Sequence, residues 1–150
     1  MTDTPNDPAS LEALVAAAWT AREGALCTYS GFAVGAALRD EHGRVWTGAN
    51  VENASYTLGL CAERVAIFAA LTHGGRGFTH VVVVTDTPQP TSPCGACRQI
   101  LWEFARHATV VMVAAGGVTA TASVAELVPM GFDDAALGPR ASSGTTAGRP

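Results

Sequence analysis

Three cysteines and one glutamate stand out because their types and spacing suit a metal site. Cys61 and Glu63 lie two positions apart, and Cys94 and Cys97 follow 33 and 36 positions after Cys61. Thiolates are soft ligands that favour a tetrahedral zinc ion. Three of them leave one coordination position for water, and a nearby carboxylate that is not a ligand can move the protons of that water. These residues therefore predict a catalytic zinc centre.

The second cysteine pair falls at the expected start of a helix. Ser92 is a suitable N-cap and Pro93 a suitable first helical residue, so Cys94 and Cys97 should lie one turn apart on one face. Unpaired N–H groups and the helix dipole at such a position lower the pKa of a thiol, and the thiolate is the form that binds metal. This placement favours ligation.

The first pair sits at the start of a helix expected over residues 61–71. Two positions on a regular helix are about 200° apart, so Cys61 and Glu63 share a pocket only if Cys61 stands at the very start. The helix is apolar nearly all round, which predicts burial on most sides. A buried carboxylate is a poor choice for stability unless it has a partner or a task, and the alternative is an exposed first turn in which Glu63 adjoins Arg64.

Composition excludes several classes of protein. With 150 residues, 48% of them hydrophobic, we expect one domain with a real core. No run of about 18 apolar residues predicts a membrane span, and no signal-peptide pattern is visible, so we expect a cytoplasmic location. Four cysteines in that setting are more often ligands or catalytic groups than disulfides. The net charge of −4, with no lysine and no basic stripe, argues against a long nucleic acid and favours a small neutral substrate.

Hydrophobic periodicity and turn residues predict the remaining elements. Beside the helix at 61–71 we expect a helix at 11–23 capped by Ser10, a hairpin with strands at 33–38 and 44–48, buried parallel strands at 81–84 and 110–114, a helix after Cys94, a short strand at 119–121 and a short helix at 124–127. On the helix after Cys94, the side chains of Arg98, Glu103 and Arg106 are available to face outward.

This order predicts an α/β fold, a three-layer α-β-α sandwich around a mixed, roughly five-stranded sheet. Residues 1–10 and 138–150 are polar or rich in Gly, Ser, Thr and Pro, and we expect them to be disordered on either side of a catalytic domain at 11–137.

A polar loop at residues 50–56 joins the hairpin to the helix that begins near Cys61. Polar loops at strand ends are where small ligands are held. Asn50 and Glu52 point the same way if the chain is still extended, and an amide beside a carboxylate is suited to binding the hydroxyls of a sugar. From the residues alone, a plain polar loop remains the alternative.

The chain resembles the small cytidine deaminase family over roughly residues 21–137. The resemblance is carried by residues 29–38, 50–56, 61–64, 92–99 and 126–129, followed by Phe132. The Cys-Ala-Glu and Pro-Cys-x-x-Cys pair is typical of the deaminase superfamily, and the Asn-Val-Glu-Asn segment is typical of nucleoside deaminases. The resemblance implies a cytidine deaminase-like fold and a homotetramer. It also implies hydrolysis of cytidine or deoxycytidine to the uridine product and ammonia.

The same resemblance implies a role for individual residues. One Zn²⁺ per chain would be bound by Cys61, Cys94 and Cys97, and Glu63 would move protons from the zinc-activated water to N3 and to the leaving ammonia. The further roles that it implies are Asn50 and Glu52 at the ribose 3′-hydroxyl, Phe32 stacked near base and sugar, the backbone of Ala54 and Ala62 at the pyrimidine edge, Tyr56 and Phe132 at the site of a neighbouring subunit, and Arg64 at the zinc-bound thiolates.

The Arg64 role has a physical reason. Three thiolates with Zn²⁺ carry a net charge of −1, which should weaken the power of the metal to acidify water. A guanidinium and two helix N-termini would offset that charge. The chain departs from the family pattern at Thr28, where a proline is usual, at Met130 and Gly131 before Phe132, and at Cys27, which has no assigned counterpart.

Three other interpretations keep part of this pattern. A deaminase of a specialised nucleoside analogue, of the blasticidin type, would share both zinc motifs, although Asn50 and Glu52 favour an ordinary ribose. A structural zinc module would use Cys27 as a fourth thiolate and exclude water. A redox pair would use Cys94 and Cys97 alone. The sequence does not separate cytidine from deoxycytidine, or pyrimidine salvage from a specialised pathway.

Overall fold

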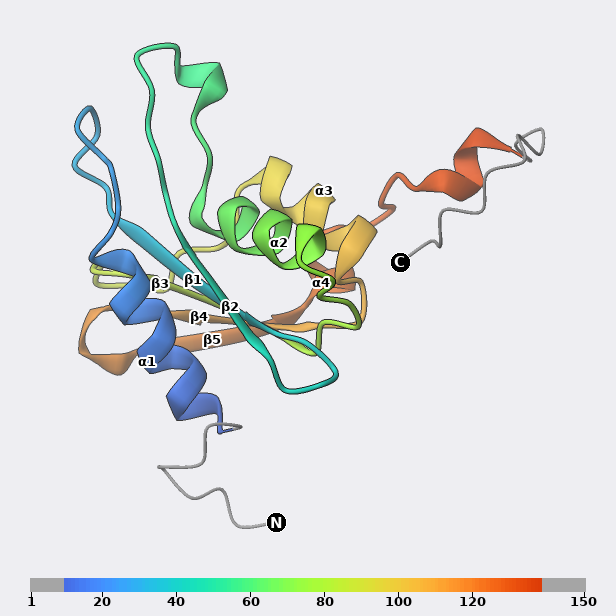
Figure 1. Ribbon diagram of the computed structural model, residues 1–150, viewed down its shortest axis with the longest axis horizontal. Helices are drawn as coiled ribbons and strands as arrows, with labels where there is room; N and C mark the ends of the chain where they lie inside the picture. Colours follow the sequence, from blue (N-terminus) through green and yellow to red (C-terminus); the bar gives the residue numbers. More distant parts are fainter. Residues whose placement is uncertain (1–9, 139–150) are drawn as a thin grey trace.

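The computed structural model describes residues 10–138, a five-stranded sheet with helices on both faces (Figure 1). The elements are α1 (Leu11–Arg22), β1 (Val34–Arg39), β2 (Val45–Ala49), α2 (Ala62–Thr72), β3 (His80–Thr85), α3 (Gly95–Phe104), β4 (Thr109–Val113), β5 (Thr119–Ser123) and α4 (Val124–Leu127). The elements for which both ends were predicted begin and end within two residues of those bounds. The side chain of Ser10 caps α1 by accepting from the Ala13 N–H, as expected. The other residues that we expected to be disordered, apart from Gly138, lie outside the residues that the structure describes.

The strand order is β2-β1-β3-β4-β5, with β3 in the centre. β3 and β4 are parallel, and the other three neighbouring pairs are antiparallel. The predicted mixed sheet of five strands and the predicted parallel pair are therefore confirmed. The valines of β3 are β-branched and buried on both sides of the sheet, as expected of a central strand covered by helices.

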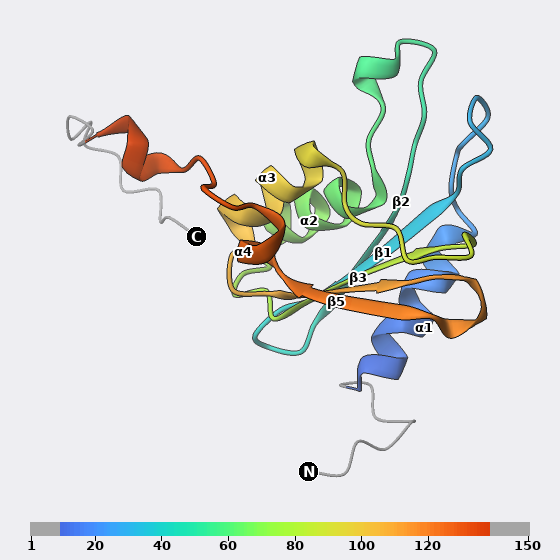
Figure 2. The ribbon, with the colours of Figure 1, turned by 180° about the vertical axis from the view of Figure 1, so that it is seen from behind.

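Alternate residues of the strands face two separate cores. One core lies under α1 and contains Leu14, Ala18, Ala37, Val82, Val84, Val111 and Val113. The other lies under α2, α3 and α4 and includes Ala36, Leu38, Ala66, Ile67, Val81, Val83, Leu101, Val110, Met112 and Val124. Figures 1 and 2 show α1 on one side of the sheet and the other helices on the opposite side. The three-layer α-β-α sandwich is confirmed.

The start of α2 lies directly against the sheet at Gly48 of β2. A Cβ atom at Gly48 would stand 2.6 Å from both the Ala62 carbonyl oxygen and the Ala66 nitrogen. Only a residue without a side chain permits this approach. Gly48 therefore fixes the height of the first turn of α2 above the sheet.

The outer side of α2 differs from the prediction of burial on most sides. Phe68 is 37% exposed, and Val65, Ala69 and Leu71 are half-buried. The sheet covers only one side of the helix, and α3 covers part of another, so an apolar strip stays open. None of the helices between residues 10 and 138 is long and apolar enough to span a membrane.

Three segments extend beyond the body of the sandwich. The loops at residues 24–33 and 50–60 project from the same end of the sheet in both views (Figures 1 and 2). The segment that follows α4, residues 128–138, extends from another side as an arm. These segments carry several exposed apolar side chains, namely Leu26, Tyr29, Phe32, Tyr56, Leu58, Met130, Phe132 and Leu137.

Candidate active site

Cys61 stands at the start of α2, as its pairing with Glu63 required. It is the N-cap residue, with extended backbone angles (φ −72°, ψ 155°), and Glu63 is the second residue of the helix. Because Cys61 is not helical, its side chain and that of Glu63 are not held about 200° apart around the helix axis. Both side chains line the same pocket.

Cys94 is itself the N-cap of α3, so the predicted start with Ser92 as cap and Pro93 as first helical residue is wrong. Arg98 explains the difference. Its Nε donates to the Pro93 carbonyl at 2.7 Å and its Nη2 donates to Ser92 Oγ at 2.8 Å, which holds both residues outside the helix. Cys94 and Cys97 remain one turn apart.

Arg98 was expected to be available to face outward, and it is instead half-buried and bonded. Its third contact runs from Nη1 to the Leu127 carbonyl, at 3.2 Å, so it also joins α3 to α4. Arg106 is also bonded, since it pairs with Asp133 at 2.9 Å and lies over the Trp102 ring, but 38% of its side chain stays exposed. Glu103 is exposed, as expected.

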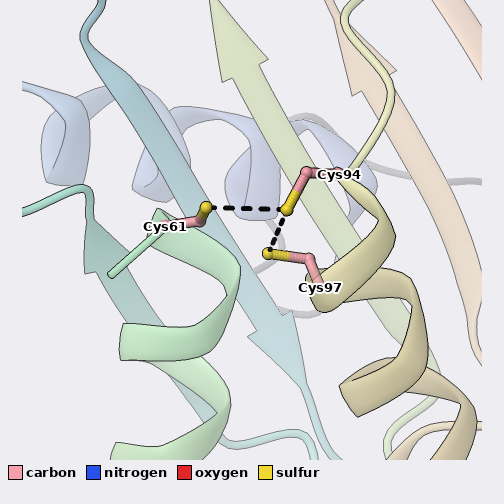
Figure 3. A group of neighbouring side chains, drawn as sticks. All are labelled: Cys61, Cys94 and Cys97. Carbon is pink, nitrogen blue, oxygen red and sulfur yellow. Dashed lines mark hydrogen bonds between the residues drawn. The ribbon is translucent and has the colours of Figure 1, made fainter. Parts of the chain in front are cut away.

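The three thiols converge between the starts of α2 and α3 (Figure 3). The Sγ atoms of Cys61 and Cys94 are 3.7 Å apart and those of Cys94 and Cys97 are 3.5 Å apart, and all three lie within 4.8 Å of one another. A tetrahedral ion with Zn–S bonds of about 2.3 Å separates its sulfur ligands by about 3.8 Å. The cluster therefore fits one zinc ion. Cys27 is not part of it, so the four described cysteines do not form the closed four-thiolate site.

The thiols share protons in a way that suits metal binding. A hydrogen bond from the Cys97 thiol, followed by contacts with Arg64 and Cys94 that act against burial, lowers the pKa of Cys61 to about 5. The same hydrogen bond, together with burial, raises the pKa of Cys97. Arg64 Nη2 lies 3.8 Å from Cys61 Sγ and also donates to the Gly59 carbonyl at 3.0 Å. A metal ion that binds here replaces the shared protons.

Glu63 is only 4% exposed, beside the cluster. Burial raises the pKa of its carboxyl, although hydrogen bonds from its own backbone N–H and from the Cys97 thiol act in the opposite direction. A carboxyl whose pKa is moved toward neutrality both accepts and returns a proton readily at physiological pH. The alternative of an exposed first turn is wrong.

A cavity of about 330 Å³ opens above these groups. It is lined by Ser30, Phe32, Val34, Asn50, Val51, Glu52, Tyr56, Gly59, Leu60, Cys61, Glu63, Arg64, Val83, Thr91, Ser92 and Cys94. The structure thus brings together most of the residues expected at the site. Cys97 and Ala62 are fully buried next to it. Ala54 is exposed in its loop, and Phe132 is 60% exposed on the arm, where its carbonyl accepts from Gln99 Nε2; neither lines the cavity.

Asn50 and Glu52 are also bonded to the neighbouring loop, which the sequence analysis did not foresee. Asn50 Oδ1 accepts from the Val34 N–H and Nδ2 donates to the Phe32 carbonyl, both at 2.8 Å. Each end of that amide keeps one further hydrogen-bonding position. Glu52 accepts from the N–H groups of Tyr29 and Ser30 at 2.7 and 3.1 Å. Both side chains therefore fix the wall of the pocket as well as facing it.

Thr91, which lines the cavity, is held by the hydroxyls of two other threonines, and the sequence did not indicate this contact. Thr85, buried at the end of β3, lies 2.6 Å from Thr87 Oγ1 and donates to Thr91 Oγ1 at 3.1 Å. Thr87 and Thr91 are 3.1 Å apart. This triangle folds the proline-rich segment before Cys94 back toward the cavity. The abundance of threonine there was the only sequence signal.

Comparison with known proteins agrees with this geometry. Residues 8–114 match the family described as the cytidine and deoxycytidylate deaminase zinc-binding region. A cytidine deaminase of Sporosarcina psychrophila is 44% identical over 124 residues, which cover 81% of this chain and 90% of the relative. The crystal structure of cytidine deaminase from Burkholderia pseudomallei has a TM-score of 0.80 and 45% identity, covering 82% of this chain and 99% of that one. A blasticidin-S deaminase of Bacillus cereus is more distant, at 28% identity over 107 residues, 66% of this chain and 76% of the relative.

Proposed function

Because this chain belongs to the cytidine deaminase family, we propose that it hydrolyses cytidine or deoxycytidine to the uridine nucleoside and ammonia. The observation that carries the proposal is a buried carboxyl, Glu63, beside three converging thiols at the floor of one cavity. The enzyme is a hydrolase whose zinc ion fits Cys61, Cys94 and Cys97. When bound, zinc supplies positive charge that makes water a nucleophile near neutral pH.

Glu63 holds and moves the protons in this proposal. A carboxylate oxygen of Glu63 takes a proton from the attacking water and delivers it to N3 of the pyrimidine. Glu63 then takes the second proton of that water from the oxygen now bonded to C4 and passes it to the amino group, which leaves as ammonia when the C4–N bond breaks. Its burial excludes bulk water from the carboxyl, so the proton is transferred to the substrate.

The sugar is proposed to bind between the two projecting loops. Asn50 and Glu52 would hold the 3′-hydroxyl with the hydrogen-bonding positions that the loop leaves free. Phe32 would pack against base and sugar from the same wall of the cavity. Among the residues that line the cavity, Arg64 is the one cation and is bonded to Gly59 and Cys61, which supports a neutral nucleoside as substrate.

We also propose that the chain acts as a homotetramer in cytoplasmic pyrimidine salvage. Support for assembly comes from apolar side chains that the chain leaves exposed, among them Phe68, Tyr56 and Phe132. Tyr56 and Phe132 would then reach the site of a neighbouring subunit, and the backbone of Ala54 and Ala62 would meet the pyrimidine edge. Light scattering on the purified protein measures the number of chains directly.

Glu63→Gln tests the function, with Glu103→Gln on the exposed side of α3 as a matched control. We expect Glu63→Gln to lower kcat for cytidine by about 10³-fold or more, because a carboxamide does not transfer protons. Zinc should stay at one ion per chain in both variants and in the unaltered protein. Unchanged activity in Glu63→Gln would remove Glu63 from the mechanism. A zinc-loaded, unaltered protein that leaves both nucleosides intact would contradict the proposed function.

A further inference from the structure

One hydroxyl joins the two loops that enclose the sugar side of the cavity. Ser30 Oγ donates to Glu52 Oε1 and accepts from the Phe32 N–H, which lies 2.9 Å away. Glu52 and Phe32 stand on different loops, and both line the cavity. Ser30 is therefore bonded at the same time to the carboxylate and to the backbone of the aromatic residue.

The hydrogen bonds on Glu52 are unequal between its two oxygens. Oε2 accepts the N–H groups of Tyr29 and Ser30, at 2.7 and 3.1 Å, which uses its two lone pairs. Among residues 10–138, Oε1 accepts only the Ser30 hydroxyl, so it keeps one acceptor position. That position is the one that remains for a hydroxyl of the ligand, and its direction is set by the Ser30 bond.

The last torsion of a free glutamate side chain is broad and has no sharp preference. The two N–H groups hold Oε2 in place, but the carboxylate can still pivot about that one oxygen as the other side-chain torsions change, and this pivot moves Oε1. Ser30 supplies that second restraint. The cost of ordering the carboxylate is then met when the protein folds and not when the substrate binds.

We propose that Ser30 is a positioning residue for recognition of the sugar 3′-hydroxyl, because it aims the free acceptor of Glu52. This inference rests on the proposed function, in which Glu52 accepts that hydroxyl. Ser30 itself needs no contact with the substrate. Its effect should therefore depend on the presence of the hydroxyl that Glu52 binds.

The test compares cytidine with 3′-deoxycytidine in the zinc-loaded enzyme. The measured quantity is the ratio of kcat/KM for the two substrates, which cancels any general loss of active protein. We expect Ser30→Ala to raise KM for cytidine about tenfold with kcat nearly unchanged, because one hydrogen bond to a charged group is lost. For 3′-deoxycytidine, Ser30→Ala and the unaltered enzyme should have the same KM.

Three further variants separate positioning from a general effect on the loop. Ser30→Thr keeps the hydroxyl and should behave as the unaltered enzyme. Thr28→Ala removes an exposed hydroxyl of the same loop that does not bond Glu52, and it should leave KM unchanged for both substrates. In a Glu52→Gln background, Ser30→Ala should have no additional effect on the ratio, since the carboxylate that it aims is gone.

The outcomes separate the role of Ser30 from the contact between Glu52 and the 3′-hydroxyl. If Ser30→Ala lowers kcat/KM by the same factor for both substrates, Ser30 has a structural role only and the inference is overturned. If the unaltered enzyme prefers cytidine and Ser30→Ala keeps that preference in full, the inference fails while the Glu52 contact stands. If the unaltered enzyme does not distinguish the two substrates, the Glu52 contact fails and takes the inference with it, although deamination itself remains established by the turnover of both.

Discussion

Two parts of the cavity are built on different kinds of structure. One part, the metal side, holds Glu63 and the three clustered thiols. The other part, the sugar side, lies between the loops at residues 24–33 and 50–60, where we propose that the sugar binds. The metal side rests on the first turns of α2 and α3, where Cys97 is 0% exposed and Glu63 is 4% exposed. The sugar side rests on two loops that project beyond the sheet, where Tyr56 is 76% exposed and Leu58 is 69% exposed. The first is held by core packing, and the second by hydrogen bonds between side chains and backbone.

The difference agrees with the role that we propose for each side. Ligand atoms and a proton-transfer group must be held within a fraction of an ångström, which helices packed on a sheet provide. A sugar must enter and leave, which loops permit. Substitutions on the metal side should therefore lower both the stability of the protein and its kcat. Substitutions on the sugar side should change substrate affinity alone.

The largest effect is expected from Cys97→Ser, which removes a fully buried ligand of the metal side. A hydroxyl is a poorer zinc ligand than a thiolate, so zinc content should fall well below one per chain, and kcat should fall at least about 10³-fold. The melting temperature should fall with it. Metal analysis, kinetics and thermal unfolding measure the three quantities.

Cys27→Ser is the control for that change, because Cys27 is a half-buried cysteine outside the cluster. It should keep zinc, activity and melting temperature. Full zinc content and activity in Cys97→Ser would show that the metal side is not built on these three thiols.

A smaller effect is expected from Gly48→Ala, which acts on the metal side from below. The new Cβ would press on the Ala62 carbonyl and the Ala66 nitrogen and lift the first turn of α2. We expect the free energy of unfolding to fall by about 1–3 kcal/mol, and zinc to be lost to a chelator faster than from the unaltered protein.

Gly95→Ala provides the matched control, because Gly95 is the first residue of α3, which bears Cys97, and has open space where a Cβ would stand. It should leave both quantities unchanged or slightly improved. Equal effects of the two substitutions would contradict the view that close packing under α2 holds the metal side in place.

The smallest effect is expected when a fall in pH protonates Glu52 on the sugar side. The Ser30 hydroxyl, and after it the N–H groups of Tyr29 and Ser30, lower the pKa of Glu52 from its ordinary value of 4.5. A depressed pKa in the folded protein means that the contribution of this contact is present above pH 4.5 and is lost as the pH falls through the lower value. The amide signals of Tyr29 and Ser30 should therefore titrate together, with a midpoint below pH 4.5. A midpoint at or above 4.5 would show that the loops are not joined through Glu52.

The sequence predicts most of the fold because local patterns and tertiary packing agree there. The valine run of β3 and the apolar stripe of α1 each determine one element and one buried face. The cluster of three thiols is equally predictable, since cysteines at this spacing beside a glutamate are typical of a zinc site. The start of α3 is not predictable in this way, because Arg98 from the next turn binds Ser92 and Pro93 and overrides a good local capping pattern.

On the sugar side, the sequence indicated residues that line the cavity but not how they are connected. Asn50 and Glu52 lie in a polar segment that indicates ligand binding, yet their partners lie about 20 residues earlier in the chain. Which loop approaches which carboxylate is decided by the pairing of β1 with β2 and by the path of the chain before it. The same reason explains why burial of α2 was overestimated: composition reports how apolar a helix is, not how many neighbours it receives.

The central place of β3 in the sheet has a consequence for synthesis on the ribosome. β1 and β2 are made first and pair with each other, but the second edge of β1 is filled only by β3, after the 30 residues between Ala49 and His80 have been added. Until then the nascent chain presents an open strand edge and an apolar α2 with no complete sheet beneath it. Cys94 and Cys97 emerge later still, so the growing chain holds only one of the three clustered thiols while residues 62–93 are added. The metal site is therefore completed only after β1, β2 and β3 have been made.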